Sequence, residues 1–354
     1  MLLDGNRSWR HLRSLRSDPP GRATEGPRRE TFGAALEQSE ELWNATSAVS
    51  PAVSPLTLFY GLSQAGRALT ATLIGDEQAW ETVPGHGLTL PRPTISADAV
   101  PSLAAVRVVD RGSAYFQQIT GLLNCPSLPQ PGATLAALCC SLPEGEEWAD
   151  VWDLPKPLKV ESTSPLTDSF VDSSIVQAWI SPFPNKMIPP GETANPQSED
   201  ELPSVDAVRN VLKPYPSLSR HNAFTRVLEA RRDVPGLWQV PSIRLCWSVD
   251  EPLSYSDRQQ WRMRLMSYVE PYPGDWAENG WAVPSVGENE APLHPLATWW
   301  AILFGMSMLA RYHPRIWTAL LDLDRSREAV AVHSVLDAAR EVVPYLLLRQ
   351  LATF

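Results

Sequence analysis

The pattern of apolar and polar positions changes twice along the chain and divides it into three parts. Apolar residues recur at helical spacing in three N-terminal segments, residues 7–16, 32–43 and 56–73. The middle of the chain is proline-rich and carries short β-branched runs, which predict strands at 106–109, 158–160, 175–180 and 243–249. Helices are also expected there, at 114–123 and 134–142. Helical spacing returns near the C-terminus, at 258–269, 296–311, 314–321, 327–342 and 344–351. This pattern predicts an α+β fold that is predominantly helical.

The longest uncharged stretch is either a buried core helix or a membrane span. Residues 291–310 carry no formal charge and include the adjacent Trp299 and Trp300. Prolines and a histidine occupy the first turn, so only residues 296–310 remain, fewer than the about 20 apolar residues of a membrane helix. A helix that is apolar around its circumference is buried in a large domain or in lipid. We expect this one to lie in a globular core, and we expect no membrane span.

The segment from Ser54 to Leu73 is predicted to be a helix with two different faces. Ser54 suits the helix cap, and a proline follows at the first helical position. Four leucines share one side, whereas Tyr60, Gln64 and Arg67 line the opposite side at i, i+4 and i+7. Small residues at 61, 63 and 66 allow another element to approach closely. A Gly-His-Gly loop around His86 follows this helix.

These elements predict four regions, at residues 1–30, 31–88, 89–256 and 257–354. The first is an arginine-rich arm with a short helix, in which the polar link 18–29 is expected to be loosely held. The second and fourth are helical, and we expect them to pack together because neither buries enough apolar surface alone. The third is a loop-rich mixed α/β insert, with a long exposed loop expected at 189–203.

Composition narrows the functional classes. The net charge of −10 argues against a general nucleic-acid-coating protein, which needs a basic footprint. The four cysteines lack metal-ligand spacing, and no phosphate loop or dinucleotide-binding glycine pattern occurs. We therefore expect no metal and no cofactor. The N-terminus lacks the apolar segment of a secretory signal, which predicts a cytoplasmic protein.

Two separated motifs resemble the signatures of the YaaC-like protein family. The first is SPLTLFYGL followed by QAGRA, at residues 54–68, with Gly-His-Gly-Leu at 85–88. The second is SMLARYHP at residues 307–314, with Trp317 three residues on. The resemblance spans most of the chain. It implies a bacterial cytosolic protein, and it implies no established reaction.

A second likeness is to HEPN-type helical domains, many of which are RNases or nucleotidyltransferase partners. The Phe-Tyr-x6-Arg-Ala helix and the His-Gly loop after it are similar to the opening helices of such domains. Their Arg-x4-6-His motif has one match here, Arg327-x5-His333, which departs from the family pattern in position. His333 is expected to share a helix face with Asp337 and Arg340. A solvated charged stripe is therefore the favoured interpretation of this match.

The candidate site is formed by the polar residues of the two YaaC-like motifs. These residues are Tyr60, Gln64, Arg67, His86, Arg311, Tyr312 and His313. If the two helices pack together, Arg67 and Arg311 converge on one pocket suited to a phosphate or carboxylate. Acidic residues are absent from 56–74 and 291–321, which favours carbonyl groups or a bound anion over ion pairs. Purely structural hydrogen bonding is the alternative interpretation.

These observations favour a non-catalytic binding or regulatory protein, because no catalytic constellation occurs in the sequence. Catalytic residues stay unknown, and the question of enzymatic activity stays open with a leaning towards none. The expected partner is a protein, or an anionic small molecule or nucleotide; oligomerisation is left open. The alternative is a HEPN-like RNase or nucleotide-acting enzyme, for which His333 would be essential.

Overall fold

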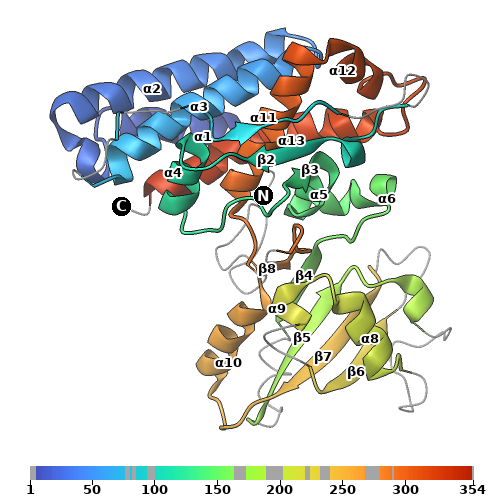
Figure 1. The fold of residues 1–354 in the computed structure, drawn as a ribbon. Helices are drawn as coiled ribbons and strands as arrows, with labels where there is room; N and C mark the ends of the chain where they lie inside the picture. Colours follow the sequence, from blue (N-terminus) through green and yellow to red (C-terminus); the bar gives the residue numbers. More distant parts are fainter. Residues whose placement is uncertain are drawn as a thin grey trace. The chain divides into compact units, whose positions relative to one another are not determined.

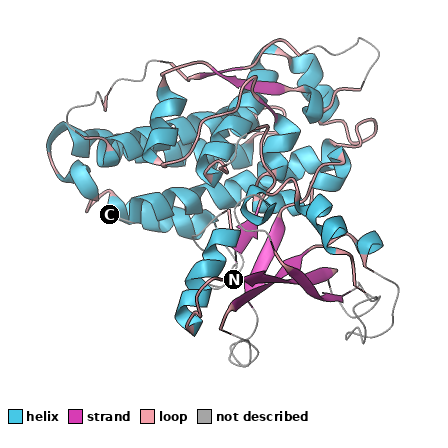
Figure 2. Cartoon of the chain, turned by 60° about the horizontal axis from the view of Figure 1, so that its bottom comes forward, coloured by secondary structure: helices cyan, strands magenta, loops and turns pink. Residues whose placement is uncertain are grey.

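The computed structural model divides the chain into two compact units. Unit 1 comprises Met1–Leu154, Val286–Asn289 and Leu293–Phe354, and unit 2 comprises Pro155–Ser285 and Glu290–Pro292. Helices dominate unit 1, whereas unit 2 contains a five-stranded sheet (Figure 2). The predicted α+β, predominantly helical class is confirmed. The structure describes residues 5–75, 80–81, 85–93, 100–162, 173–188, 202–219, 224–231, 240–267, 280–288 and 291–352.

Unit 1 combines helices from both ends of the chain (Figure 1). The N-terminal helices are α1 (Gly5–Leu15), α2 (Gly26–Ala45) and α3 (Ser54–Leu73). The C-terminal helices are α11 (Pro295–Tyr312), α12 (Pro314–Leu320) and α13 (Ala329–Ala352). α3 packs against α2, α11 and α13, and α1 packs against α13. The prediction that the two helical ends pack together is confirmed.

α11 is the central buried helix of unit 1. Every residue from Pro295 to Ser307 is buried, and Trp299 and Leu303 are fully so. The helix begins at Pro295, and the His294 side chain caps it by accepting a hydrogen bond from the Leu296 N–H at 3.1 Å. None of the helices in the described part of the chain has the length and hydrophobicity that a bilayer crossing requires. The predicted core helix is confirmed.

Residues 88–154 belong to unit 1, so the insert begins later than predicted. They form a small antiparallel sheet of β1 (Leu88–Thr89), β2 (Arg107–Asp110) and β3 (Ala133–Thr134). Three short helices accompany it: α4 (Tyr115–Leu122), α5 (Leu135–Cys140) and α6 (Ala149–Trp152). Both α4 and α5 pack on α11, since their apolar side chains complete its burial. The expected boundaries at residues 89 and 256 therefore differ from the observed ones, which fall at Pro155 and Ser285.

Unit 2 is built on an antiparallel sheet with strand order β6-β7-β5-β4-β8. The strands are β4 (Leu158–Ser162), β5 (Ile175–Ser181), β6 (Arg226–Arg231), β7 (Ser242–Ser248) and β8 (Gly280–Ala282). Its helices are α8 (Val205–Leu212), α9 (Pro216–Ser219) and α10 (Tyr255–Arg262). Alternate strand residues such as Val160, Ala178 and Leu245 form a core with Val208 and Leu212 of α8. Most of the loop predicted at 189–203 lies outside the described residues.

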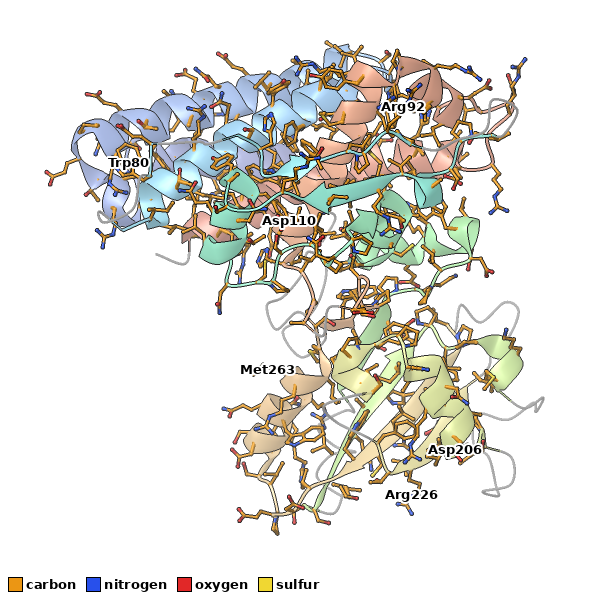
Figure 3. The ribbon with its side chains drawn as sticks, viewed as in Figure 1. Trp80, Arg92, Asp110, Asp206, Arg226 and Met263 are labelled. Carbon is orange, nitrogen blue, oxygen red and sulfur yellow. The ribbon has the colours of Figure 1, made fainter. Side chains whose placement is uncertain are left out.

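The link at residues 18–29 packs on the end of α3, so the prediction that it is loosely held is wrong. Ala23 is fully buried, and Gly21 lies so close to the Thr72 carbonyl that a Cβ there would stand 2.8 Å from its oxygen. Arg28 donates to the carbonyls of Ala71 and Ile74 at 2.9 and 3.0 Å. The last carbonyls of a helix lack intrahelical partners, and this guanidinium satisfies two of them. Arg28 also covers the ring of Trp80, which is labelled in Figure 3.

Two predictions about helix ends are also wrong. α3 begins at Ser54, but the Ser54 hydroxyl does not cap the helix and has no hydrogen-bond partner among the described residues. α13 continues through Pro344, where the sequence predicted a break between two helices. Proline removes the N–H that would bond the carbonyl four residues earlier, that of Arg340. In this fold the Trp43 indole N–H donates to that carbonyl at 3.1 Å, so α2 supplies the missing donor.

Candidate functional site

Tyr60 and Arg311 are the predicted site residues that the fold joins directly. α3 and α11 run antiparallel, with Phe59 against Phe304 at 5.5 Å between ring centroids. This places the end of α11 beside the first half of α3, where Arg311 Nη1 donates to the Tyr60 hydroxyl at 3.1 Å. The guanidinium also lies 5.0 Å from the centre of the Tyr312 ring. Both tyrosines are solvent-accessible, with exposed fractions of 39% for Tyr60 and 54% for Tyr312.

A glycine on α3 permits the close approach of α11. A Cβ at Gly66 would lie 2.5 Å from the Trp300 ring and 2.7 Å from the Tyr115 hydroxyl. Only a residue without a side chain leaves room for these two rings. The expectation that small residues of this helix allow close packing is confirmed for Gly66.

His86 is held by a loop that is fastened to the start of α4. Gly85 and Gly87 on either side have φ of 94° and 76°, a region that glycine enters without strain. The carbonyls of Gly85 and His86 accept hydrogen bonds from the first two N–H groups of α4 at 3.2 and 3.1 Å. These N–H groups have no partner inside the helix, so the loop satisfies them. The backbone on both sides of His86 is therefore fixed.

The side chain of Gln117 in α4 holds the same loop in place through hydrogen bonds. Its amide donates to the Gly87 carbonyl at 3.1 Å and to the carboxylate of Asp110, the last residue of β2 (Figure 3). Its carbonyl oxygen accepts from the Ala114 N–H at 2.9 Å. Ser127 donates to the other carboxylate oxygen of Asp110. A Cβ at position 87 would overlap the Gln117 side chain, so this arrangement requires glycine.

The His86 ring rests on two phenylalanines of the helix pair. Its centroid lies 5.3 Å from that of Phe59 and 5.9 Å from that of Phe304. Burial against these rings lowers the pKa of His86 below its ordinary value of 6.5, and the nearby positive charge of Arg311 lowers it further. At neutral pH the ring is therefore uncharged. It forms no hydrogen bond with any residue that the structure describes.

Arg67 and Gln64 lie further along α3. Seven residues separate Arg67 from Tyr60, which is about 10 Å along a helix that rises 1.5 Å per residue. Arg67 is exposed and its charge acts on the Tyr115 hydroxyl, whose pKa is raised by burial. The side chains of Arg67 and Gln64 form no hydrogen bond or ion pair with the described residues. The shared pocket of Arg67 and Arg311 stays a prediction.

His313 forms the junction between α11 and α12. Its N–H donates to the Leu309 carbonyl at 2.9 Å, and its own carbonyl accepts from Ile316 and Trp317 at 2.9 and 3.0 Å. The ring is half-buried. We use the name Arg311 centre for Tyr60, His86, Arg311 and Tyr312, which the structure brings together. Sequence reasoning missed the residues that fix the His86 loop, Asp110 and Gln117, because nothing in the sequence sets the register between α4 and this loop.

Other reactive groups offer no alternative site in the described part of the chain. No group of three or more metal-ligating side chains occurs there. Burial raises the pKa of Cys140 to about 12, so this thiol stays protonated at neutral pH. Arg327 is exposed before the start of α13, and His333 is half-buried with its ring nitrogen 3.4 Å from the Leu321 carbonyl.

The fold and the Arg311 centre together define an α+β protein whose helical unit carries a cationic and aromatic centre between its N- and C-terminal helices. A family model described as YaaC-like Protein matches residues 9–351. The chain therefore belongs to the YaaC-like protein family, as its two motifs indicated. It matches no curated protein and no solved structure.

Proposed function

We propose that the chain is a non-catalytic binding or regulatory protein whose Arg311 centre recognises a carboxylate or phosphate group. The group would belong to a protein, a small molecule or a nucleotide. One observation carries the proposal. Arg311 is a solvent-accessible guanidinium that pairs with a neutral phenol and, among the described residues, with no carboxylate.

The donors of Arg311 support this proposal. A guanidinium has five N–H donors in a fixed fork, and one donor of Arg311 is used on Tyr60. The remaining donors suit bidentate contact with a planar or tetrahedral anion. Position also contributes, since a cation in the last turn of α11 is stabilised by the helix dipole. The dipole explains why a cation is tolerated there, but it uses none of the free donors.

His86 would complete the recognition of the anion. An uncharged imidazole beside an arginine adds an N–H donor or an acceptor without adding repulsion to Arg311. Its fixed backbone means that little conformational entropy is lost when a ligand binds. No carboxylate orients this ring among the described residues, unlike the base of a hydrolytic triad. This difference favours binding over catalysis.

Thermal shift and calorimetric titration of the purified chain test the proposal. The probes are inorganic phosphate, succinate and adenosine monophosphate. They present a free phosphate, a carboxylate on a small molecule, and a phosphate on a nucleotide. Arg311→Met should weaken binding of at least one probe by about 10- to 100-fold, since a charged hydrogen bond contributes roughly 1.5–3 kcal/mol. Arg325→Met is the matched control, because this side chain is 85% exposed and only loosely paired with Asp322.

Two results would count against the proposal. Equal affinity of the wild type and Arg311→Met for every probe would remove the Arg311 centre as the binding site. RNA cleavage by the purified protein, abolished by His333→Ala, would support the HEPN-like alternative instead. A binding protein should leave RNA intact under the same conditions.

A further inference from the structure

Exposed aromatic surface surrounds the guanidinium of Arg311. Among the large apolar side chains that are exposed in the described part of the chain, three are tyrosines: Tyr60, Tyr255 and Tyr312. Two of them contact Arg311, Tyr60 through a hydrogen bond and Tyr312 through its ring. His86, which is also exposed, adds a third ring to the centre. Aromatic rings that stay in contact with water beside a cation are typical of a binding surface.

Tyr312 presents one face of its ring to Arg311 and keeps the other for a ligand. The guanidinium lies over the ring, 5.0 Å from its centre, which is the geometry of a cation–π contact. The residue is nevertheless 54% exposed, so its accessible surface includes the face that points away from the guanidinium. Nucleic-acid bases stack on tyrosine faces of this kind, because every base has a planar π-surface.

The polar groups of the Arg311 centre offer donors from three different side chains. The Tyr60 hydroxyl accepts from Arg311 at 3.1 Å, and its own O–H has no acceptor among the described residues. Arg311 uses one of its five N–H donors in this bond, and the uncharged ring of His86 adds another N–H. A phosphate group has three strong acceptor oxygens, whereas a carboxylate has two. Donors from three side chains therefore suit a phosphate better than a carboxylate.

We infer that the ligand of the Arg311 centre is a free nucleoside monophosphate. Arg311, Tyr60 and His86 bind its phosphate, and its base stacks on the outer face of Tyr312. This inference rests on the anion recognition proposed above, and it narrows the anion to a phosphate attached to a planar ring system. A nucleotide joins these two groups through a ribose, so both can engage neighbouring side chains of one centre. A purine covers more of the tyrosine ring than a pyrimidine and should bind more tightly.

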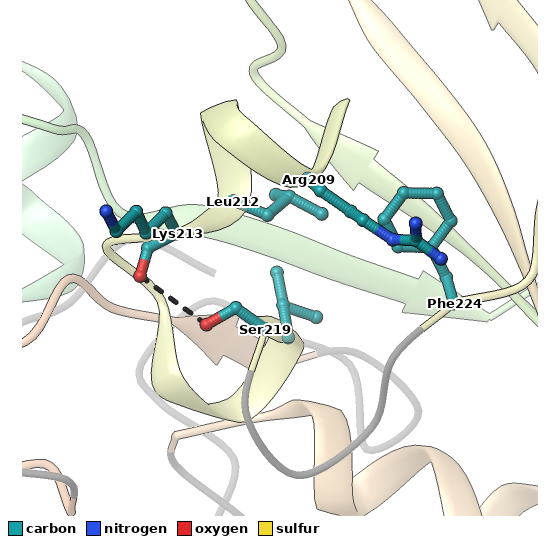
Figure 4. A pocket seen from close by; sticks show the side chains of 6 residues that line it. Arg209, Leu212, Lys213, Ser219 and Phe224 are labelled. Atoms are coloured by element: carbon teal, nitrogen blue, oxygen red, sulfur yellow. Dashed lines mark hydrogen bonds between the residues drawn. The ribbon is translucent and has the colours of Figure 1, made fainter. Parts of the chain in front are cut away.

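The hollow in unit 2 does not offer this combination (Figure 4). Its lining residues are Arg209, Leu212, Lys213, Leu218, Ser219 and Phe224. The apolar ones are buried, Phe224 being only 2% exposed, so they present almost no surface to a ring. The charged ends of Arg209 and Lys213 point away from each other in Figure 4. Arg209 still lies over the Phe224 ring, 5.8 Å from its centre, which makes it a matched control for an arginine on an exposed ring.

Calorimetric titration of the full chain with four probes tests this inference. Adenosine monophosphate carries phosphate and base, ribose 5-phosphate lacks the base, adenosine lacks the phosphate, and inorganic phosphate lacks both base and ribose. Adenosine monophosphate should bind at one site, about tenfold or more tighter than each of the other three probes. Saturation-transfer NMR should show its strongest signals on the adenine protons, because the base contacts the ring of Tyr312.

Variants of Tyr312 separate stacking from anion binding. Tyr312→Ala should weaken adenosine monophosphate about tenfold and leave ribose 5-phosphate nearly unchanged, because only the base contacts this ring. Tyr312→Phe keeps the ring and should restore the binding of the nucleotide. Tyr312 is exposed at the end of α11, so both variants should fold. Tyr255→Ala, at a 38% exposed position of α10, and Arg209→Met are the controls and should leave nucleotide binding unchanged.

The outcomes distinguish this inference from the proposed function. Suppose that Arg311→Met weakens both phosphate-bearing probes, but Tyr312→Ala binds adenosine monophosphate as tightly as the wild type does. That result would overturn the inference and leave anion recognition by Arg311 intact. Equal affinity of the wild type for adenosine monophosphate and ribose 5-phosphate, or no nucleotide binding at millimolar concentration, would also overturn it. Unchanged binding of every probe in Arg311→Met would remove the proposed function, and the inference with it.

Discussion

His294→Asn should make the stability of the chain less sensitive to mild acid. The His294 ring caps α11, with Nδ1 accepting from the Leu296 N–H at 3.1 Å. Only an uncharged ring has this acceptor, and burial lowers the pKa of His294 from 6.5 to about 4. Asparagine is a favoured helix cap that does not titrate, so it keeps an acceptor and removes the pH dependence.

The sign and size of this effect follow from the two pKa values. Between pH 6.5 and 4 the unfolded chain binds a proton that the folded chain excludes, so folding stability falls as the pH falls. The stabilisation is fully present above pH 6.5, the value in the unfolded chain. At pH 5 the expected loss is about 2 kcal/mol, and near pH 4 it approaches roughly 3 kcal/mol.

Urea unfolding at pH 7.5 and pH 5.0, followed by tryptophan fluorescence, measures this loss. The difference in free energy of unfolding between the two pH values should be about 2 kcal/mol smaller for His294→Asn than for the wild type. Other titrating groups are common to both proteins and cancel. His11→Asn changes an exposed histidine of α1 and should behave like the wild type. An equal acid sensitivity of His294→Asn and the wild type would refute the reasoning.

Two further predictions concern the core of unit 1. Leu303→Ala should lower the free energy of unfolding by about 2–5 kcal/mol in denaturant titration, because Leu303 is fully buried in α11; Leu323→Ala, at a 64% exposed position, should change it little. Trp43→Phe should cost about 1–3 kcal/mol, because it leaves the carbonyl of Arg340 without a donor beside the helix proline. An unchanged unfolding midpoint in either variant would contradict its assigned role.

The helices that form the core of unit 1 could be predicted, because their signals are local. An uncharged run that follows prolines predicts α11, and a regular spacing of leucines predicts α3. The continuity of α13 could not be predicted in this way. Proline normally ends a helix, and the donor that compensates for Pro344 comes from Trp43, which lies 297 positions before Arg340 in the sequence. Such compensation depends on tertiary packing that no local pattern contains.

The sheet of unit 2 was predicted in part. β5 and β7 consist mainly of apolar and β-branched residues, and the sequence indicates both. β6 reads Arg-Val-Leu-Glu-Ala-Arg and has a register shift between Val227 and Glu229, so its alternation is broken. The unit boundaries could not be predicted, because β1, β2, α4 and α5 resemble the insert in composition but pack on α11. Contacts, which composition does not reveal, decide the boundary.

The candidate site shows the same limit. The residue types of the Arg311 centre stood out because few acids surround them in sequence, and the packing of α3 on α11 could be expected from their apolar faces. Which arginine would meet Tyr60 depends on the antiparallel register of the two helices, and the sequence left Arg67 and Arg311 equivalent. The structure pairs Tyr60 with Arg311 and leaves Arg67 near Tyr115.

Because unit 1 is divided between the two ends of the chain, its helical core cannot be completed until α11 and α13 have been synthesised. All strands of unit 2 lie within Pro155–Ser285, so its sheet is complete in sequence before α11 begins at Pro295. The leucines of α3, in contrast, are buried only after α11 and α13 have been synthesised and have packed against this helix. Contacts across such a separation form slowly, and apolar helices left uncovered in the meantime are prone to aggregate. We therefore expect nascent chains that end before residue 295 to contain a folded unit 2 sheet, together with N-terminal helices whose apolar surface is still exposed and prone to aggregate.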